Sequence, residues 1–494
     1  MTYLNYIQIF YRYRLALLVA LFYGFSSASA QKTQVAFTSS DKGLEQAFIW
    51  AKKTAMQYKG AETDAVGPWY EAALPSRNAF CMRDASHQSI GAEILGLSRE
   101  NLNMFTLFAK NVSAPKNWCS YWEINNLGQP APEDYRNDRE FWYNLPANFD
   151  VLFATWRLYK WTGNQYYINS PSFVYFQQKT VKEYIDTWVL SSDSLLKRPA
   201  HPHAPMPYNE TDYFHTCRGL PSYSEGIPDM RTGVDLVASL YRGLQTYADI
   251  LSARGMHKEA KIYAQKAKRY LERLETDWWN AQLGDYYLYY SSKDKFVKDG
   301  AVPYLLWFDA LKDTARLKLH LAQIASIKSN VETTSYLPYL FYKNGEWDQA
   351  KQYILYLSDP ATPRREYPEV SFGVIDGIVQ GLMGVSADAQ ASTISTVFKT
   401  SGKESATITN LPLLQTTIDL IHSSTRQSTI FNSGKKPFKW KAFFCGNYPQ
   451  VTVNGISKSA KKQTNPQGKM MSWVELEVKP GMRVKVEVNP IFKR

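Results

Sequence analysis

Carboxylates set among aromatic residues are the side chains of this sequence best suited to acid–base chemistry. Asp84, Glu225 and Glu369 each lie in a short stretch that also holds aromatic residues. Such surroundings let one carboxyl group keep its proton while another stays ionised. Cleavage of a glycosidic bond needs that pair, because one acid protonates the leaving oxygen while a second carboxylate activates water or attacks the sugar. We therefore treat these three acids as candidate catalytic residues.

Several neighbouring side chains are suited to holding a sugar. Arg83 and His87 lie beside Asp84, and each offers hydrogen-bond donors to a hydroxyl or carboxylate group. The other candidates for substrate binding are Trp142, Asp229, Arg231, Glu332 and Tyr367. The alternative for the acidic residues is structural, because each lies where a carboxylate would cap a helix or match its dipole.

Two histidine-containing stretches raise the question of a metal. His201 and His203 flank a proline, and His215 lies two residues before Cys217. Imidazole and thiolate are zinc ligands, but this spacing matches no standard zinc site. The sequence also contains neither a phosphate-binding loop nor a dinucleotide-binding glycine pattern. We therefore expect neither a metal nor an organic cofactor.

Helices are expected to position these residues from about residue 41 to residue 390. Apolar residues recur at helical spacing, and the clearest helical pairs lie at residues 236–274, with Gly255 in the turn, and at 336–357. We find about twelve such segments but no fixed repeat of the kind that solenoids have. Consecutive hairpins of this number predict a closed helical toroid with a central funnel.

The periodicity changes to two after the helical region. Residues 473–478 and 483–488 alternate apolar and polar side chains, with Pro480-Gly481 as a turn between them. The expected organisation is a catalytic helical domain over residues 31–390 and a small β-sandwich-like domain over residues 391–494. The chain is thus expected to be mainly α.

The first thirty residues have the features of an export signal. Arg12 and Arg14 precede an apolar run at residues 15–25, and Ala28-Ser29-Ala30 is a small-residue cleavage site. The apolar run is too short for a comfortable membrane span. We expect residues 1–30 to be removed and the protein to be exported, to the periplasm or the medium, without a membrane anchor.

Composition and charge exclude other classes. The 494 residues are 45% hydrophobic and contain only four, widely separated cysteines, which excludes a disordered chain or a disulfide-stapled mini-domain. The formal net charge is +12, but the basic residues are scattered, so we expect no nucleic-acid partner. A basic chain suits acidic substrates such as uronic-acid sugars, although solubility alone explains the charge equally well.

Over about residues 41–390, the pattern resembles the six-hairpin glycoside hydrolases with an (α/α)6 toroid, of the exported bacterial type. Arg83-Asp84 is similar to the first-loop acid that lines the sugar subsite in those enzymes. The stretch 225–236, with an acid shortly before Val-Asp-Leu, resembles a trehalase-type segment. Glu369 lies where a carboxylate base in a late loop is expected. Those enzymes often carry an additional β-domain, as the C-terminal region here would be.

The resemblance implies a carbohydrate substrate and general acid–base catalysis. It assigns proton donation to Glu225, with Asp229 as the alternative, and the role of base to Glu369, with Glu332 or Glu366 as alternatives. It also implies inversion at the anomeric carbon.

Individual residues suggest a substrate, and two other functions are possible for the same sequence. A uronate carboxylate clamped by Arg83 or Arg231 would give a β-glucuronidase-like specificity. The first rival is a polysaccharide lyase on a similar toroid, which would use His87, Tyr223 or His215 to abstract a proton and would release an ultraviolet-absorbing product. The second rival is a glycan-binding protein without catalysis.

Overall fold

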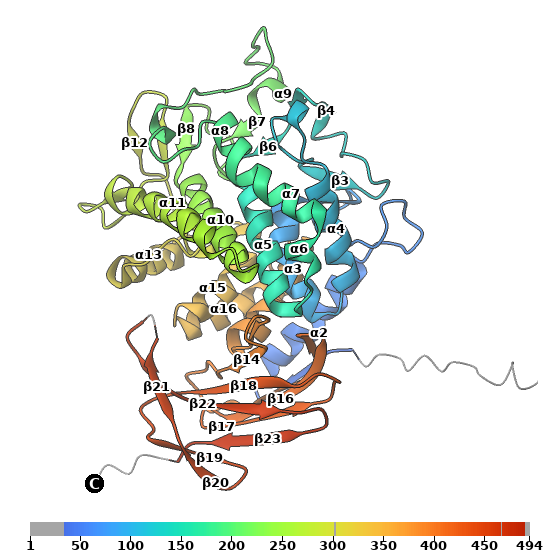
Figure 1. The fold of residues 1–494 in the computed structure, drawn as a ribbon, viewed down its shortest axis with the longest axis vertical. Coiled ribbons are helices and arrows are strands. Elements are labelled where there is room, and N and C mark those ends of the chain that lie inside the picture. Colours follow the sequence, from blue (N-terminus) through green and yellow to red (C-terminus); the bar gives the residue numbers. More distant parts are fainter. Residues whose placement is uncertain (1–33, 301–302, 466, 490–494) are drawn as a thin grey trace, which may run out of the picture. The chain divides into compact units, whose positions relative to one another are not determined.

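Helices form most of the described chain before residue 383 (Figure 1). The computed structural model describes residues 34–300, 303–465 and 467–489, so the predicted signal peptide lies outside the described residues. The longer helices are α2 (Lys42–Gln57), α3 (Met82–Ile94), α4 (Ser98–Lys110), α5 (Ala147–Thr162), α7 (Pro171–Lys179), α10 (Val234–Ala253), α11 (His257–Thr276), α13 (Thr314–Ser326), α15 (Leu337–Lys343), α16 (Trp347–Ser358) and α17 (Pro368–Asp376). Short helices are α6 (Tyr166–Asn169), α8 (Ile185–Thr187), α9 (Tyr213–Thr216), α12 (Tyr304–Trp307) and α14 (Val331–Ser335), with π-helical turns at Thr180–Tyr184 and Gly377–Leu382.

The two predicted helical pairs are confirmed. Helices α10 and α11 form a hairpin whose turn contains Gly255 at φ +78°, a conformation that glycine adopts without strain. Helix α10 is buried on most of its surface, whereas α11 buries one stripe that includes Ala267 and Leu274. Since an amphipathic helix turns its apolar stripe to the core, α11 packs on the outside of α10. Helices α15 and α16 form the second pair.

Six helices pack in a closed circuit. Helix α3 contacts α5 and α17, α5 contacts α10, α10 contacts α12, and α17 contacts α14. The circuit closes where Tyr304 of α12 meets Tyr336, which ends α14, with ring centroids 5.8 Å apart. Helices α2 and α16 pack behind α17. The ends of the helices in this circuit therefore face a common centre.

The C-terminal strands form two sheets (Figure 1). The seven-stranded sheet runs in the order β1 (Ala36–Ser39), β15 (Ala406–Leu413), β16 (Thr416–Ser424), β17 (Gln427–Asn432), β23 (Arg483–Glu487), β19 (Gln450–Val453) and β20 (Ile456–Ser459). The five-stranded sheet runs in the order β13 (Ser386–Asp388), β14 (Thr393–Thr396), β18 (Phe438–Cys445), β22 (Met470–Val478) and β21 (Lys461–Thr464).

Short strands join the loops of the helical region. They are β2 (Ala79–Cys81) with β3 (Glu123–Asn125), β4 (Tyr135–Asn137) with β5 (Glu140–Phe141), β6 (Tyr143–Asn144) with β7 (Arg218–Leu220), β9 (Trp279–Asn280) with β10 (Asp285–Tyr286), and β8 (Met230–Gly233) with β11 (Tyr289–Ser291) and β12 (Phe296–Val297).

The strands of the β region are distributed between its sheets differently from what the sequence predicts. The predicted strands β22 and β23 are present, but they lie in different sheets although only a short turn at Pro480-Gly481 separates them. The seven-stranded sheet also takes β1 from the N-terminal side of the helices. With 41% helix and 22% strand, the chain combines helical and β-rich regions, and "mainly α" describes only residues 42–382. No helix within the described residues is long and apolar enough to cross a membrane.

Candidate active site

A cavity of about 430 Å³ opens at the centre of the helical circuit. Its volume lies within the range of small-molecule sites, roughly 300–1,000 Å³. The lining side chains come from α3, the loop before β8, α12, α14 and α17. They are Arg83, Asp84, His87, Tyr223, Ser224, Glu225, Pro303, Tyr304, Ser329, Asn330, Glu332, Thr333, Ser335, Tyr336 and Glu369. The structure therefore brings together six of the ten residues that the sequence singled out, from positions almost 290 residues apart.

The first turn of α3 supplies Arg83 and Asp84, and its second turn supplies His87. Cys81 caps this helix, because its sulfur accepts the backbone N–H of Asp84 at 3.4 Å. The Asp84 carboxylate is therefore not the cap. It accepts instead from Nε of Arg83 at 3.1 Å. Arg83 is in turn 3.7 Å from Glu225 through Nη1, so one guanidinium lies beside two carboxylates of the cavity.

Glu225 lies at the open side of the cavity. Its side chain is 39% exposed. Burial among the surrounding loops raises the pKa of Glu225, Arg83 counteracts this rise, and the negative charges of Asp84 and Glu332 add to it. Glu225 is therefore a carboxylate whose ionised form depends on Arg83.

Glu369 lies at the closed side, in the first turn of α17. It is 6% exposed, and its Oε2 atom has no hydrogen-bond partner within the described residues. Tyr367 begins the helix without a side-chain capping bond, and Glu369 does not cap it. Burial, followed by the charge of Asp84, holds the pKa of Glu369 well above its ordinary value. A carboxyl group in this position favours the protonated form.

The floor of the cavity is aromatic and is fixed by a buried acid. His87 packs against Trp307, with ring centroids 4.3 Å apart, and against Tyr336 at 4.9 Å. Asp150 of α5 is fully buried beneath it and accepts from Nε2 of His87 at 3.1 Å. The same carboxylate accepts from the Tyr223 hydroxyl at 3.1 Å and the Trp307 indole at 2.9 Å. The imidazole ring is therefore held in one orientation.

Sequence reasoning missed Asp150, Tyr304, Trp307 and Tyr336. Of these four, only Asp150 could have been identified from the sequence, because an acidic residue inside the apolar stretch of α5 must be buried and paired. The three aromatic residues lie in ordinary apolar segments and meet only through the helical circuit.

Of the three candidates for the catalytic base, Glu332, Glu366 and Glu369, two line the cavity and one does not. Glu332 lines the cavity and accepts from Arg364 at 3.1 Å, and Glu369 lines it as well. Glu366 is exposed and is not on the cavity wall. Although only three residues separate them, Glu369 is buried in the cavity wall and Glu366 is exposed to solvent.

Four predicted binding residues lie away from the cavity wall, and each has protein partners there. Trp142 stacks on Tyr213, with centroids 5.4 Å apart, and donates to Asn144 at 2.8 Å. The other three have protein partners too: Asp229 accepts from Tyr289, Arg231 donates to Asp294 and to two backbone carbonyls, and Tyr367 lies under the guanidinium of Arg364.

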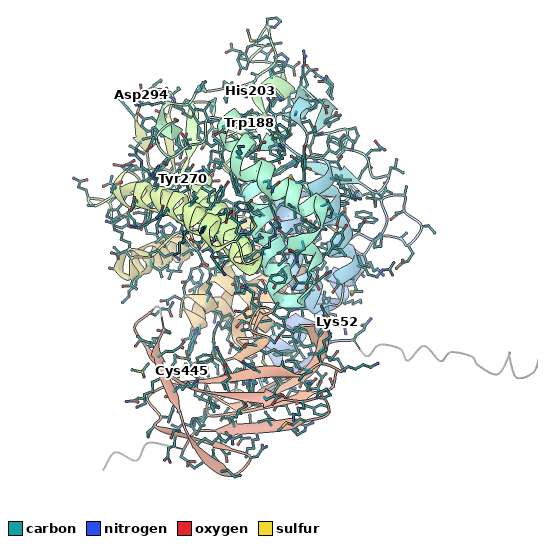
Figure 2. The ribbon with its side chains drawn as sticks, in the orientation of Figure 1. Lys52, Trp188, His203, Tyr270, Asp294 and Cys445 are labelled. Carbon is teal, nitrogen blue, oxygen red and sulfur yellow. The ribbon has the colours of Figure 1, made fainter. Side chains whose placement is uncertain are left out.

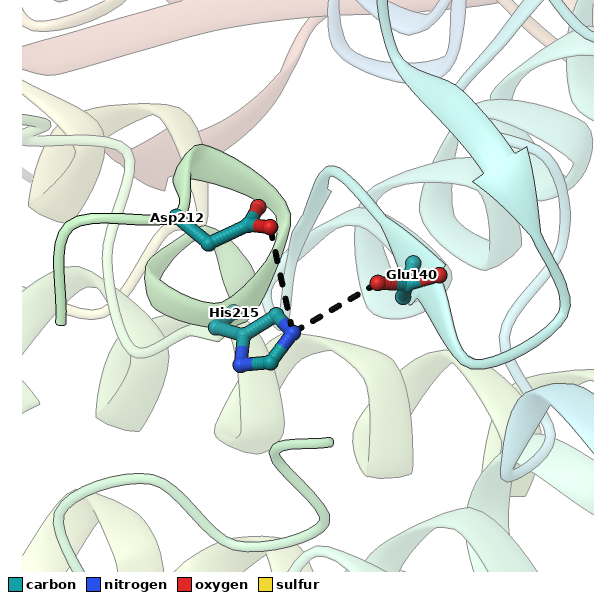
Figure 3. Close-up of side chains that lie close together, drawn as sticks. All are labelled: Glu140, Asp212 and His215. Atoms are coloured by element: carbon teal, nitrogen blue, oxygen red, sulfur yellow. Dashed lines mark ion pairs between the residues drawn. The ribbon is translucent and has the colours of Figure 1, made fainter. Parts of the chain in front are cut away.

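A cluster of Glu140, Asp212 and His215 has the donor types of a metal site (Figure 3). Nε2 of His215 lies 3.4 Å from Glu140 and 4.0 Å from Asp212. However, Arg136 donates to both carboxylates, at 2.7 Å and 3.2 Å, and the ring's Nδ1 accepts a backbone N–H. Since the Arg136 guanidinium already engages both carboxylates, we do not assign a metal ion to this cluster.

Comparison with known proteins supports the fold. No family model and no curated protein match the sequence. The structure is similar to that of a rhamnosidase of Bacillus sp. GL1, with a TM-score of 0.54 and 11% identity over 81% of this chain. Rhamnosidases from Dictyoglumus thermophilum and Aspergillus terreus give TM-scores of 0.57 and 0.52, at 12% identity over 92% and 91% of the chain.

These similarities concern the fold alone, because the identity is low. The chain spans 40% of the Bacillus enzyme and 50% of each of the other two. It therefore shares the helical and β-rich architecture of about half of each larger protein.

Proposed function

We propose that this protein is a glycoside hydrolase that uses general acid–base catalysis in the central cavity. The observation that carries the proposal is the convergence of Asp84, Glu225, Glu332 and Glu369 on one aromatic-floored cavity. Glycoside hydrolysis requires two carboxyl groups in different protonation states, and this cavity offers one deeply buried acid and one acid beside a guanidinium.

The fold is consistent with this proposal. We infer that the closed circuit of α3, α5, α10, α12, α14 and α17 is the inner ring of an (α/α)6 toroid. The similarity to three rhamnosidases supports that inference, and it makes a rhamnoside-type substrate the first to test.

The environments of the two acids reverse the roles expected from the sequence. Glu369 is the better proton donor, because its unpaired buried oxygen and raised pKa favour the protonated form. Glu225 is the better base of the two, because Arg83 and solvent stabilise its carboxylate, so that its pKa is raised less than the pKa of Glu369. Asp84 keeps Arg83 in place.

The charges of the cavity favour a neutral sugar over a uronate. Four acidic side chains and one arginine line it, and that arginine already contacts Asp84 and Glu225. Arg231, the other predicted uronate clamp, is held by Asp294 away from the wall. A substrate carboxylate would meet net negative charge without a free cation. We therefore propose a neutral pyranoside as the substrate.

The test is hydrolysis of a panel of neutral aryl glycosides, rhamnosides first, beside uronate oligosaccharides. We expect the purified protein to release chromophore from a neutral glycoside without producing ultraviolet absorbance. Glu369→Gln and Glu225→Gln should each lower kcat by roughly 10²–10⁴, the usual contribution of a positioned acid or base. Glu366→Gln, three residues from Glu369 but outside the cavity, serves as the matched control and should keep the wild-type rate.

Other outcomes of this panel overturn the proposal. Ultraviolet-absorbing product from the uronates alone would identify a lyase that uses His87 or Tyr223, both of which line the cavity. Glycan binding that is unchanged in both variants, together with no turnover of any substrate, would identify a binding protein.

A further inference from the structure

A second cavity, of about 370 Å³, lies where the helical region meets the five-stranded sheet. One wall comes from α15, the start of α16 and the π-helical turn Gly377–Leu382, and the other comes from β13, β14, β18, β21 and β22. Cys445, labelled in Figure 2, lies on the sheet wall. No residue of the candidate active site lines this cavity.

The charge of this cavity is opposite to that of the first. Lys343, Lys399 and Lys469 line it, and none of its described lining residues is an aspartate or a glutamate. Lys343 is already paired with Asp309, and Lys469 lies over the ring of Trp347 at 5.5 Å. The Lys399 ammonium has no hydrogen-bond or ion-pair partner among the residues that the structure describes, so its charge is left uncompensated.

The surroundings of Lys399 disfavour the charged form of its side chain. Burial and the neighbouring Lys343 charge lower the pKa of Lys399 to about 8, against a small opposing effect of Cys445. Lys399 is half-buried, an ammonium partly removed from water without a counter-ion is unfavourable, and an anionic ligand beside it would offset that penalty.

The remaining walls suit a sugar ring. The aromatic side chains of Tyr339, Trp347 and Phe443 are partly buried and line the cavity, and aromatic rings are surfaces against which a pyranose can pack. Gln380 and Gln463 contribute amide groups that can bind hydroxyls. Aromatic faces, amides and one free cation together match a charged carbohydrate better than an inorganic ion.

We propose that this second cavity binds a sugar unit carrying one negative charge, as a carboxylate or a sulfate ester. A third cavity, lined in part by α13, shares Gly345, Gln467 and Lys469 with it, so the ligand has room to continue as a chain. Helix α15 connects the two sites, because Tyr336 at its start lines the first cavity and Lys343 at its end lines the second. Its seven residues span about 10 Å.

This inference does not depend on hydrolysis in the first cavity. Together with the proposed function, it describes an enzyme that would cleave a neutral sugar from a glycan that also carries acidic units. The net charge led us to expect an acidic substrate. We now propose that its acidic group binds in the second cavity and not at Arg83 or Arg231, the clamps that the sequence suggested.

The experiment measures binding by calorimetry with the full chain carrying Glu369→Gln, so that no probe is consumed. The probes are a trigalacturonate, its neutral methyl ester and a sulfated trisaccharide. We expect an acidic probe to bind at least tenfold more tightly than the neutral ester. Adding Lys399→Met should abolish that preference, Lys399→Arg should retain most of it, and Lys403→Met, at an exposed lysine outside the cavity, should leave it unchanged.

Comparison of the two acidic probes identifies the group that is bound. Equal affinity for the neutral ester and both acidic probes would overturn the proposal. Undiminished preference in the Lys399→Met variant would overturn it as well, because the acid would then bind elsewhere. Since the readout is binding alone, these results stand whether or not the first cavity hydrolyses glycosides.

Discussion

At the residue scale, the candidate active site depends on an acid that does not touch the cavity. Asp150 accepts three hydrogen bonds, from His87, Tyr223 and Trp307, and is fully buried. A carboxylate has lone pairs for all three donors, whereas an amide offers one oxygen and adds an NH₂ group. Asp150 is therefore a positioning residue for the aromatic floor.

Replacing Asp150 with Asn tests this role. The NH₂ group would face at least one of the present donors, and an unsatisfied buried group costs roughly 1–3 kcal/mol. We expect urea unfolding to show a loss of stability in that range and a lower rate of glycoside hydrolysis. Asp186→Asn, at an exposed position of α8, should change neither quantity. Wild-type stability in the Asp150→Asn variant would contradict the network.

Individual residues also show how far the sequence predicts the site. Asp84, Glu225, Glu332 and Glu369 were identified because polar groups clustered before helices, and all four meet in the cavity. Trp142 was misplaced because its indole is engaged by Tyr213 and Asn144, which local sequence does not reveal.

At the element scale, glycines set how closely the helices of the circuit approach. A Cβ atom on Gly91 of α3 would lie 2.5 Å from the backbone oxygen of Phe372 in α17. A Cβ atom on Gly373 would lie 2.1 Å from the backbone oxygen of Ser335, at the end of α14. These contacts bring the helices that carry Asp84, Glu332 and Glu369 together.

Substituting Gly91 with Ala is therefore expected to separate α3 from α17. Overpacking of this kind costs typically 1–3 kcal/mol, because backbone cannot move aside as a side chain can. We expect a loss of stability in that range on urea unfolding, together with lower hydrolytic activity as Asp84 moves away from Glu369.

Gly43 of α2 provides the matched control. The nearest atom to a Cβ there is Cδ2 of Leu355, the end of a flexible side chain, at 3.0 Å. Gly43→Ala should change stability by less than about 0.5 kcal/mol, since helix propensity favours alanine. Equal effects of the two substitutions would contradict the close approach of α3 and α17.

The helices and their two hairpins were predictable, whereas the pairing of the C-terminal strands was not. Apolar periodicity located α10, α11, α15 and α16, because an amphipathic stripe is a local property. The assignment of β22 and β23 to different sheets depends on partners distant in sequence, so alternation alone left it open.

At the scale of the whole molecule, the helical and β-rich regions share one compact unit from Val35 onward. Strand β1 crosses from the N-terminal side to pair with β15, and the Trp161 indole of α5 donates to the carbonyl of Pro412 at 3.0 Å. The sequence predicted a boundary near residue 390 from the change of periodicity. Periodicity marks where strands begin but does not show that they pack against the helices.

One buried histidine at this junction makes stability depend on pH. His422 of β16 is fully buried, lies 2.7 Å from the Ser428 hydroxyl and donates through Nε2 to the carbonyl of Met383 at 3.1 Å. Burial lowers its pKa from 6.5 to about 4. As pH falls below about 6.5, the unfolded chain binds a proton that the folded chain does not, so stability decreases until pH reaches about 4.

We expect His422 to lower the free energy of unfolding of the wild-type protein by about 2 kcal/mol when the pH falls from 7 to 5. Urea unfolding of His422→Gln should show a pH dependence smaller by that amount, whereas His257→Gln, at an exposed histidine, should retain the wild-type slope. Should His422→Gln fail to fold, the ring of His422 can be titrated directly by NMR in the wild-type protein. A midpoint near 6.5 would contradict the buried junction, because only removal from water holds this imidazole neutral at pH 5.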